Sequence, residues 1–172
     1  HAVAYVMMAF RIAWFKVYHP LAFYAAYFSI RAKAFDLRIM TGDLKTQLTE
    51  FNRIKALDRA ASPKDKDLMS ALEVSMEMYQ RGYRFINVDI QHSEARRFSI
   101  KDGALLPPFL AIDSLGETVA DAIVAEREER PFTSLKDLQR RCKVSNTIID
   151  LMKDLKCCGE LPEDEQMSLF GA

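Results

Sequence analysis

Residues 112–124 read IDSLGETVADAIV, and this stretch decides the predicted fold. An apolar residue, Leu115, stands directly before Gly116, and Ala120 and Ile123 follow at helical spacing. The pattern predicts a tight turn at Leu115-Gly116 that leads straight into a helix. An ordinary helix start capped by Ser114 is the alternative interpretation.

A glycine turn followed by a helix is typical of the helix-hairpin-helix motif. Glycine lets the main chain come close to a phosphate, and the first N–H groups of the helix have no intrahelical partner. Such contacts read no base sequence and depend strongly on salt. We therefore predict that Leu115, Gly116, Glu117 and Thr118 bind the backbone of duplex DNA.

A second helical unit, residues 132–161, follows directly, as expected for a packed pair of such motifs. Its turn, RCKVS, contains no glycine, so we expect this half to be mainly structural. We still predict that the basic residues Arg140, Arg141 and Lys143 reach phosphates. The predicted helices of this domain, residues 111–161, cover about 117–126, 134–141 and 146–156.

The first 80 residues favour helices. The clearest start signal is Ser62-Pro63-Lys64-Asp65, in which Ser62 caps, Pro63 takes the first helical position and Asp65 bonds back to the cap. The predicted helices cover about 1–18, 20–34, 44–54 and 63 to a stop at Gly82. The first two are apolar nearly all round, which predicts neighbours on more than one side.

After Gly82 the apolar pattern changes. Tyr83, Phe85, Val88 and Ile90 predict one or two short extended pieces. Residues 97–100 and 105–109, around Asp102-Gly103, predict a β-hairpin. The predicted fold class is therefore mainly α with a small β-hairpin connector, residues 81–110, in which a helical segment precedes a tandem helix-hairpin-helix domain.

Charge excludes one class of protein. The 172 residues include 24 basic and 24 acidic ones, so the formal net charge is zero and a globally basic nucleic-acid binder is excluded. The first 35 residues nevertheless hold Arg11, Lys16, Arg31 and Lys33 and no acidic residue, which favours a local positive face. Solvated charges on a helix pair are the alternative.

Other features concern the setting of the chain. Three cysteines, two of them adjacent at Cys157-Cys158, exclude a disulfide framework and favour the reducing cytoplasm. The apolar stretch 17–30 contains Pro20 and is shorter than the roughly 20 residues of a membrane-spanning helix, so we expect no membrane partner. Because the chain begins at His1, we expect a piece of a larger protein or a processed product.

No pattern for catalysis is evident. The histidines and cysteines lack metal-ligand spacing, and the six glycines form no phosphate-binding loop of the Walker or Rossmann type. Pairs such as Glu73 with Glu77 are typical of charged helix faces. We therefore expect no metal site, no cofactor and no catalytic residue in this chain.

His1 and Tyr5 lie one helical turn apart, so an imidazole and a phenol share one face. We predict that this face meets a nucleotide; core packing of an aromatic residue is the alternative.

The acidic end, residues 162–172, is too short to bury a core, and we predict a flexible tail. It contains the apolar pair Leu169-Phe170, which packing within the folded chain does not explain and which is typical of a docking peptide. A random tail end is the alternative. The predicted docking peptide consists of Gln166, Met167, Ser168, Leu169 and Phe170.

As a set, these residues resemble the C-terminal part of the replicative DNA polymerase III alpha subunit of the PolC type, a bacterial family. The resemblance covers essentially the whole chain. It rests on motifs in the family's order: HAVAY at 1–5, RIAWFKV at 11–17, RGY at 81–83, LPPF at 106–109, LGE at 115–117 and QMSLF at 166–170.

The resemblance implies a role for each segment. Residues 1–80 would belong to the polymerase fingers, with His1 and Tyr5 contacting the incoming dNTP, and residues 111–161 would grip duplex DNA. Residues 166–170 would bind the bacterial sliding clamp. The palm, whose carboxylates hold magnesium, precedes this segment in the family, so we expect the chain to be inactive without the remainder of the polymerase.

A non-catalytic helix-hairpin-helix DNA-binding adaptor with a clamp-docking tail is the alternative. The two hypotheses differ at the N-terminal end. An adaptor would bury the apolar surface of residues 3–30 within itself, whereas a polymerase fragment would expose it.

Overall fold

The computed structural model describes residues 1–164, which are mainly helical with one small antiparallel sheet. The predicted fold class is thus confirmed. The chain forms two compact units and crosses between them more than once. The first unit holds residues 1–86 and 97–107, and the second holds 87–96 and the chain from Pro108 onward. Residues 81–110, predicted as a separate connector, are therefore divided between the two units.

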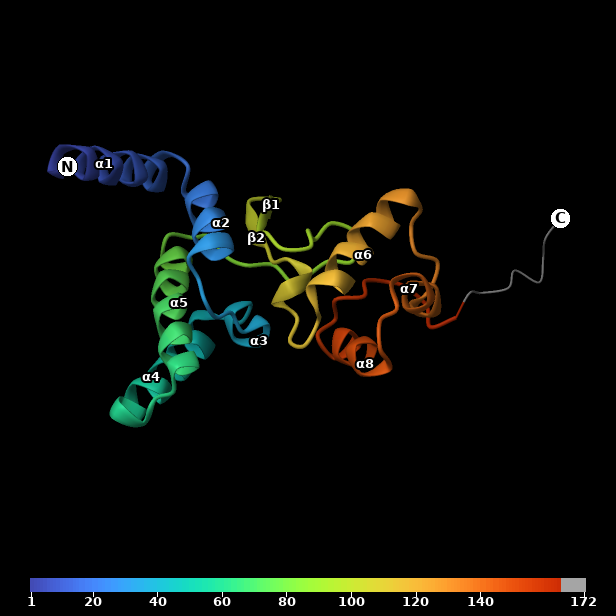
Figure 1. Cartoon of the computed structure of the whole chain (residues 1–172). Coiled ribbons are helices and arrows are strands. Elements are labelled where there is room, and N and C mark those ends of the chain that lie inside the picture. Colours follow the sequence, from blue (N-terminus) through green and yellow to red (C-terminus); the bar gives the residue numbers. More distant parts are fainter. Residues whose placement is uncertain (165–172) are drawn as a thin grey trace. The chain divides into compact units, whose positions relative to one another are not determined.

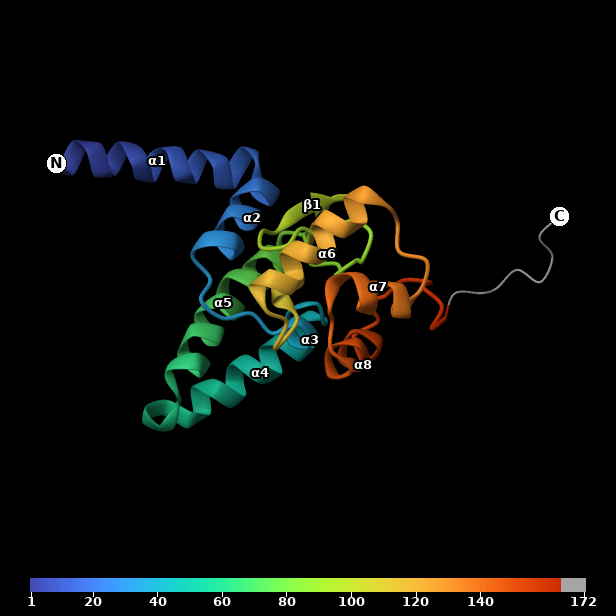
Figure 2. The same ribbon diagram turned by 45° about the vertical axis from the view of Figure 1, so that its right-hand side comes forward.

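Five α-helices build most of the first unit (Figure 1). They are α1 (Ala2–Tyr18), α2 (Pro20–Ile30), α3 (Leu37–Met40), α4 (Leu44–Leu57) and α5 (Pro63–Gln80), with a 3₁₀ turn η1 (Asp58–Ala60) before α5. The helices α4 and α5 lie side by side in both views (Figure 2). The predicted cap of α5 is present: Ser62 Oγ accepts from the Asp65 N–H at 3.1 Å, and Asp65 Oδ2 accepts from the Ser62 N–H at 3.0 Å.

The core of the first unit joins α2, α4 and α5 to the segment that follows them. Tyr24, Ile54 and Leu72 are among its fully or nearly fully buried side chains. Phe28 of α2 packs edge-on against Phe85, with ring centroids 4.9 Å apart. One face of α2 is therefore buried in the core of this unit.

The predicted hairpin is present as β1 (Ser99–Lys101) and β2 (Ala104–Leu106). Its turn residues, Asp102 and Gly103, have φ values of 51° and 74°, as a two-residue hairpin turn requires. Phe85 forms an isolated bridge to Leu105. The other predicted extended residues, Val88 and Ile90, are buried in the second unit but form no strand.

The first helix buries nothing. None of the residues of α1 is buried, and Val3, Phe10 and Val17 are each more than 60% exposed. Only its end is fixed by polar contacts: Lys16 pairs with Glu77 at 2.7 Å, and Arg81 donates to the Lys16 carbonyl at 3.0 Å. Within the described residues, most of the apolar surface of α1 is therefore exposed.

The second unit consists of short helices around its own core (Figure 2). They are η2 (Phe109–Ala111), α6 (Glu117–Glu129), α7 (Leu135–Cys142) and α8 (Asn146–Asp154). Phe109, Ile123, Leu138 and Met152 are fully buried in it. The prediction of three helices after residue 112 is confirmed, with boundaries shifted by a few residues.

The first residues of the predicted tail are bound to the second unit. The Leu135 N–H donates to the Pro162 carbonyl at 2.9 Å, and the Lys136 N–H donates to the Glu163 carbonyl at 3.2 Å. Lys153 pairs with the Glu163 carboxylate at 2.7 Å. The folded part therefore extends at least to Asp164, beyond the predicted boundary at 161.

Within residues 1–164, no helix combines the length and the apolarity needed to cross a membrane.

Candidate nucleic-acid interface

The turn before α6 is built as the sequence predicts. Ser114 takes the left-handed conformation with φ 64°, Leu115 is buried, and Gly116 is the N-cap of α6 with φ −75° and ψ 156°. The helix therefore does not start from a Ser114 cap, which was the alternative interpretation. Because Gly116 has no side chain, no cap oxygen covers the first N–H groups of α6.

The turn before α8 has the same construction. Lys143 takes the left-handed conformation with φ 54°, Val144 is buried, and Ser145 is the N-cap of α8 with φ −71° and ψ 156°. The Ser145 side chain accepts a hydrogen bond from the Ile148 N–H at 3.3 Å. Ser145 thus occupies in the second turn the place that Gly116 has in the first.

The correspondence continues into the two helices. Each has a threonine as its second residue, Thr118 in α6 and Thr147 in α8. Buried residues then follow at the same steps, Ala120 and Ile123 in α6 and Ile149 and Met152 in α8. The second unit therefore contains two copies of one turn-and-helix arrangement, although their sequences share little.

The two copies differ at the position that matters most for an anion. A Cβ added to Gly116 would meet no atom within 4 Å, so the fold itself does not require a glycine there. The open space leaves the main chain accessible to a ligand. In the second turn the Ser145 hydroxyl accepts from the Ile148 N–H, so one of the first N–H groups of α8 already has a partner.

Two carboxylates near the start of α6 pair with the same arginine. Arg96 pairs with Glu117 and with Asp121, each at 2.5 Å. The hydrogen bond from Arg96 lowers the pKa of Asp121 below its usual value. Nothing in the sequence pattern indicated this contact, because Arg96 lies outside the motif and far from α6 along the chain.

Arg141, predicted to reach a phosphate, contacts groups of the protein itself. Its side chain is only 10% exposed. It donates to Glu126 at 2.9 Å and to the Arg130 carbonyl at 3.1 Å, and its guanidinium lies over the Phe132 ring. The guanidinium therefore links α7 to the end of α6.

Asp137 is the centre of that contact. Its side chain is fully buried and accepts from Arg140 at 2.7 Å, Arg141 at 3.2 Å and Arg130 at 3.3 Å. Burial raises its pKa, but hydrogen bonds from the Thr133 N–H, Arg141 and Arg140 outweigh burial and hold the pKa below the usual value. Asp137 could not be singled out from the sequence, because an acidic residue in the first turn is common in ordinary helices.

The other two predicted basic contacts lie at the surface. The Arg140 side chain is 66% exposed while it contacts Asp137. Lys143 is exposed in the left-handed turn itself. One positive group therefore lies at the end of α7, and the other lies in the second turn itself.

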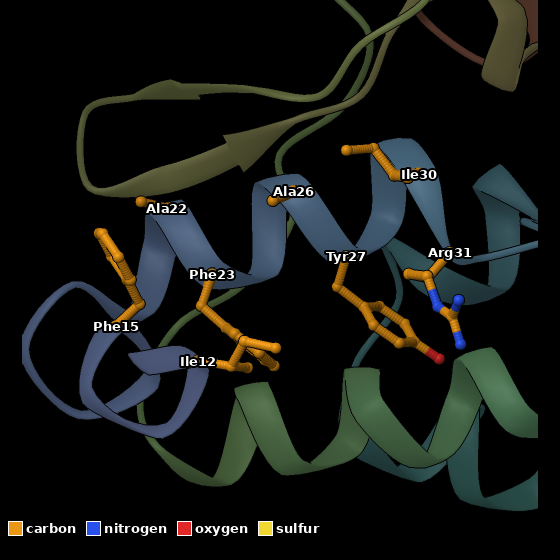
Figure 3. A pocket seen from close by; sticks show the side chains of 8 residues that line it. All are labelled: Ile12, Phe15, Ala22, Phe23, Ala26, Tyr27, Ile30 and Arg31. Carbon is orange, nitrogen blue, oxygen red and sulfur yellow. The ribbon is translucent and has the colours of Figure 1, made fainter. Parts of the chain in front are cut away.

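His1 and Tyr5 are both exposed at the start of α1, and neither belongs to a buried core. Their ring centroids are 5.7 Å apart in an edge-on arrangement. Core packing, the alternative for Tyr5, does not occur within the described residues. They do not line the apolar groove of about 680 Å³ between α1 and α2, which Ile12, Phe15 and Phe23 help to form (Figure 3).

The cysteines are buried thiols. Burial raises the pKa of Cys157 to about 12 and that of Cys142 to about 11, so neither is a thiolate at neutral pH. Among residues 1–164, no three His, Cys, Asp or Glu side chains are grouped as a metal site would require. The predicted docking peptide, residues 166–170, lies outside the described residues.

Comparison with known proteins agrees with this geometry. Residues 82–166 match the family described as a helix-hairpin-helix motif. Proteins named DNA polymerase III PolC-type match 99% of the chain: those of Caldanaerobacter subterraneus subsp. tengcongensis at 47% identity, Streptococcus suis at 46% and Streptococcus pyogenes serotype M12 at 44%. The chain is similar to one segment of PolC-type DNA polymerase III. It spans 12% of the length of these relatives.

We predict that Asp137→Asn lowers the free energy of unfolding of the second unit by roughly 3 kcal/mol at neutral pH, because three guanidinium groups lose their buried counter-charge. The pKa of Asp137 is depressed, so its contribution is present above the unfolded pKa of about 3.9 and is lost as the pH falls through the folded value. The variant should therefore lose less stability than wild type on acidification.

Hydrogen exchange of the α7 amides as a function of pH and urea measures this unit separately from the first. Asp150→Asn, on the exposed face of α8, is the matched control and should behave as wild type. Equal protection in Asp137→Asn and wild type at neutral pH would contradict the prediction.

Proposed function

We propose that the chain is the C-terminal part of a replicative bacterial DNA polymerase that performs DNA-directed DNA synthesis. One observation carries the proposal: 99% of the chain is similar to a PolC-type relative. The two equivalent hairpin turns of the second unit support it. In this role the chain contributes positioning and retention. The catalytic carboxylates and their magnesium belong to the remainder of the polymerase, in the cytoplasm.

The second unit is proposed to hold duplex DNA by its backbone. At the first turn, Leu115 anchors the loop, and the main chain of Gly116, Glu117 and Thr118 faces a phosphate. At the second turn, Arg140 and Lys143 supply positive charge. Contacts of this kind give affinity for any duplex sequence and weaken as salt increases.

The first unit is proposed to serve the incoming dNTP. His1 and Tyr5 share an exposed face of α1, where an imidazole and a phenol meet a base or phosphates. The proposal rests on the resemblance of HAVAY to the fingers of the family, and exposure of both side chains supports it.

The surface of α1 favours the polymerase over the adaptor alternative. An adaptor complete in itself would bury this helix, yet its apolar side chains, such as Phe10 and Trp14, are about half exposed or more. The groove between α1 and α2 adds to this apolar surface (Figure 3). We therefore propose the remainder of the polymerase chain as the partner of α1.

We predict that Gly116→Val weakens binding of a mixed-sequence duplex by roughly tenfold, the value of one hydrogen bond to a charged group. A side chain at this position fits the free protein, since a Cβ meets nothing within 4 Å, but it obstructs a phosphate. Fluorescence anisotropy of a labelled duplex at low salt measures the change with the 172-residue chain.

Gly116→Ala should give an intermediate loss, because its side chain is smaller. Thermal unfolding of all three proteins checks that the fold is unchanged. Wild-type affinity in the valine variant would place DNA on another surface and contradict this part of the proposal.

We also propose that residues 166–170 tether the chain to the bacterial sliding clamp, with Leu169 and Phe170 as apolar anchors. Leu169→Ala combined with Phe170→Ala should abolish binding in a calorimetric titration of the chain into a purified clamp. A chain truncated before Gln166 is the control and should fail in the same way, while both retain duplex binding. Clamp affinity unaffected by these changes would remove the tether from the proposal.

A further inference from the structure

The start of α6 carries a charge that opposes its proposed ligand. Glu117 and Asp121 lie four residues apart, so their carboxylates share one face of the helix. Their side chains are 64% and 49% exposed. Two carboxylates beside the helix N-terminus would repel a phosphate that approaches the main chain of Gly116.

Arg96 pairs with both carboxylates at once. Its Nε donates to Asp121 Oδ1 at 3.1 Å and its Nη2 to Asp121 Oδ2 at 2.5 Å, while its Nη1 donates to Glu117 Oε2 at 2.5 Å. This forked geometry suits a guanidinium and cannot be reproduced by an ammonium group. The arrangement orients the two carboxylates toward Arg96.

The main chain just before Arg96 is hydrogen-bonded to η2, the 3₁₀ turn that precedes the Leu115-Gly116 turn. The Phe109 N–H donates to the Glu94 carbonyl at 2.9 Å, and the Leu110 N–H donates to the Ala95 carbonyl at 3.1 Å. Arg127 of α6 also donates to the Ser93 carbonyl at 2.9 Å. Arg96 thus projects from a segment fixed to both η2 and α6, the two elements that flank the turn.

We propose that Arg96 is a positioning residue for DNA: it pairs with Glu117 and Asp121 and offsets part of their negative charge, so that a backbone phosphate binds at the N-terminus of α6. The inference rests on the proposed function of the first hairpin. Arg96 acts through the two carboxylates and not by touching the phosphate. Its 48% exposed side chain remains within reach of solvent salt, so the effect belongs to low ionic strength.

The test is a double-mutant cycle on duplex binding by the 172-residue chain at low salt. Arg96→Ala should weaken binding by roughly fivefold, since two unpaired carboxylates then face the phosphate. In a Glu117→Gln, Asp121→Asn background the same Arg96→Ala change should have almost no effect. Arg97→Ala removes the same charge from the neighbouring residue and is the matched control, with little change expected.

The outcomes separate the inference from the function on which it rests. An equal loss from Arg96→Ala in both backgrounds would mean that Arg96 contacts DNA directly, and it would overturn the inference. Loss in Gly116→Val but none in Arg96→Ala would also overturn it, while leaving the hairpin function intact. Wild-type binding in Gly116→Val would mean instead that the hairpin function has failed. Thermal unfolding, unchanged across the variants, excludes loss by misfolding.

Discussion

The arrangement of the second unit depends on the buried carboxylate of Asp137. Arginines from the end of α6 and from the last turn of α7 converge on it, so one negative charge fixes the course of the chain from α6 into α7. The second hairpin turn starts at the residue after α7. Removing this charge would therefore disturb the second turn without touching its own residues. Arg141 and Arg140 both contact Asp137, but the Arg141 side chain is 10% exposed and that of Arg140 is 66% exposed.

The two hairpin turns share one backbone geometry but differ in how the following helix is capped. Both follow a left-handed residue and a buried apolar residue, and both end in an extended N-cap. The first turn leaves its helix N-terminus without a side-chain cap, and Arg96 pairs with Glu117 and Asp121 of α6. The second covers one N–H with Ser145 and places Lys143 at the surface. In the proposed function, a phosphate meets main-chain donors at the first turn and side-chain charge at the second.

Much of this could be predicted from local signals. The Ser62 cap and the Asp102-Gly103 turn follow from the chemistry of a few adjacent residues, and Leu115-Gly116 indicated the first hairpin. Contacts between residues distant along the chain could not be predicted in this way. Arg96 meets α6 only because the chain crosses between the units, and Asp137 is buried only because α6 and α7 meet. Val88 and Ile90 were predicted to lie in short extended pieces; they are buried but have no strand partner, because an apolar pattern alone does not specify a ladder.

We propose that the second unit binds the DNA backbone without reading sequence. The most direct measurement is the affinity of the 172-residue chain for two duplexes of unrelated sequence over a range of salt concentrations. The account predicts equal affinities and a common linear decrease of log affinity with log salt, because only phosphates are contacted. Binding of one duplex alone, or affinity that does not respond to salt, would contradict it.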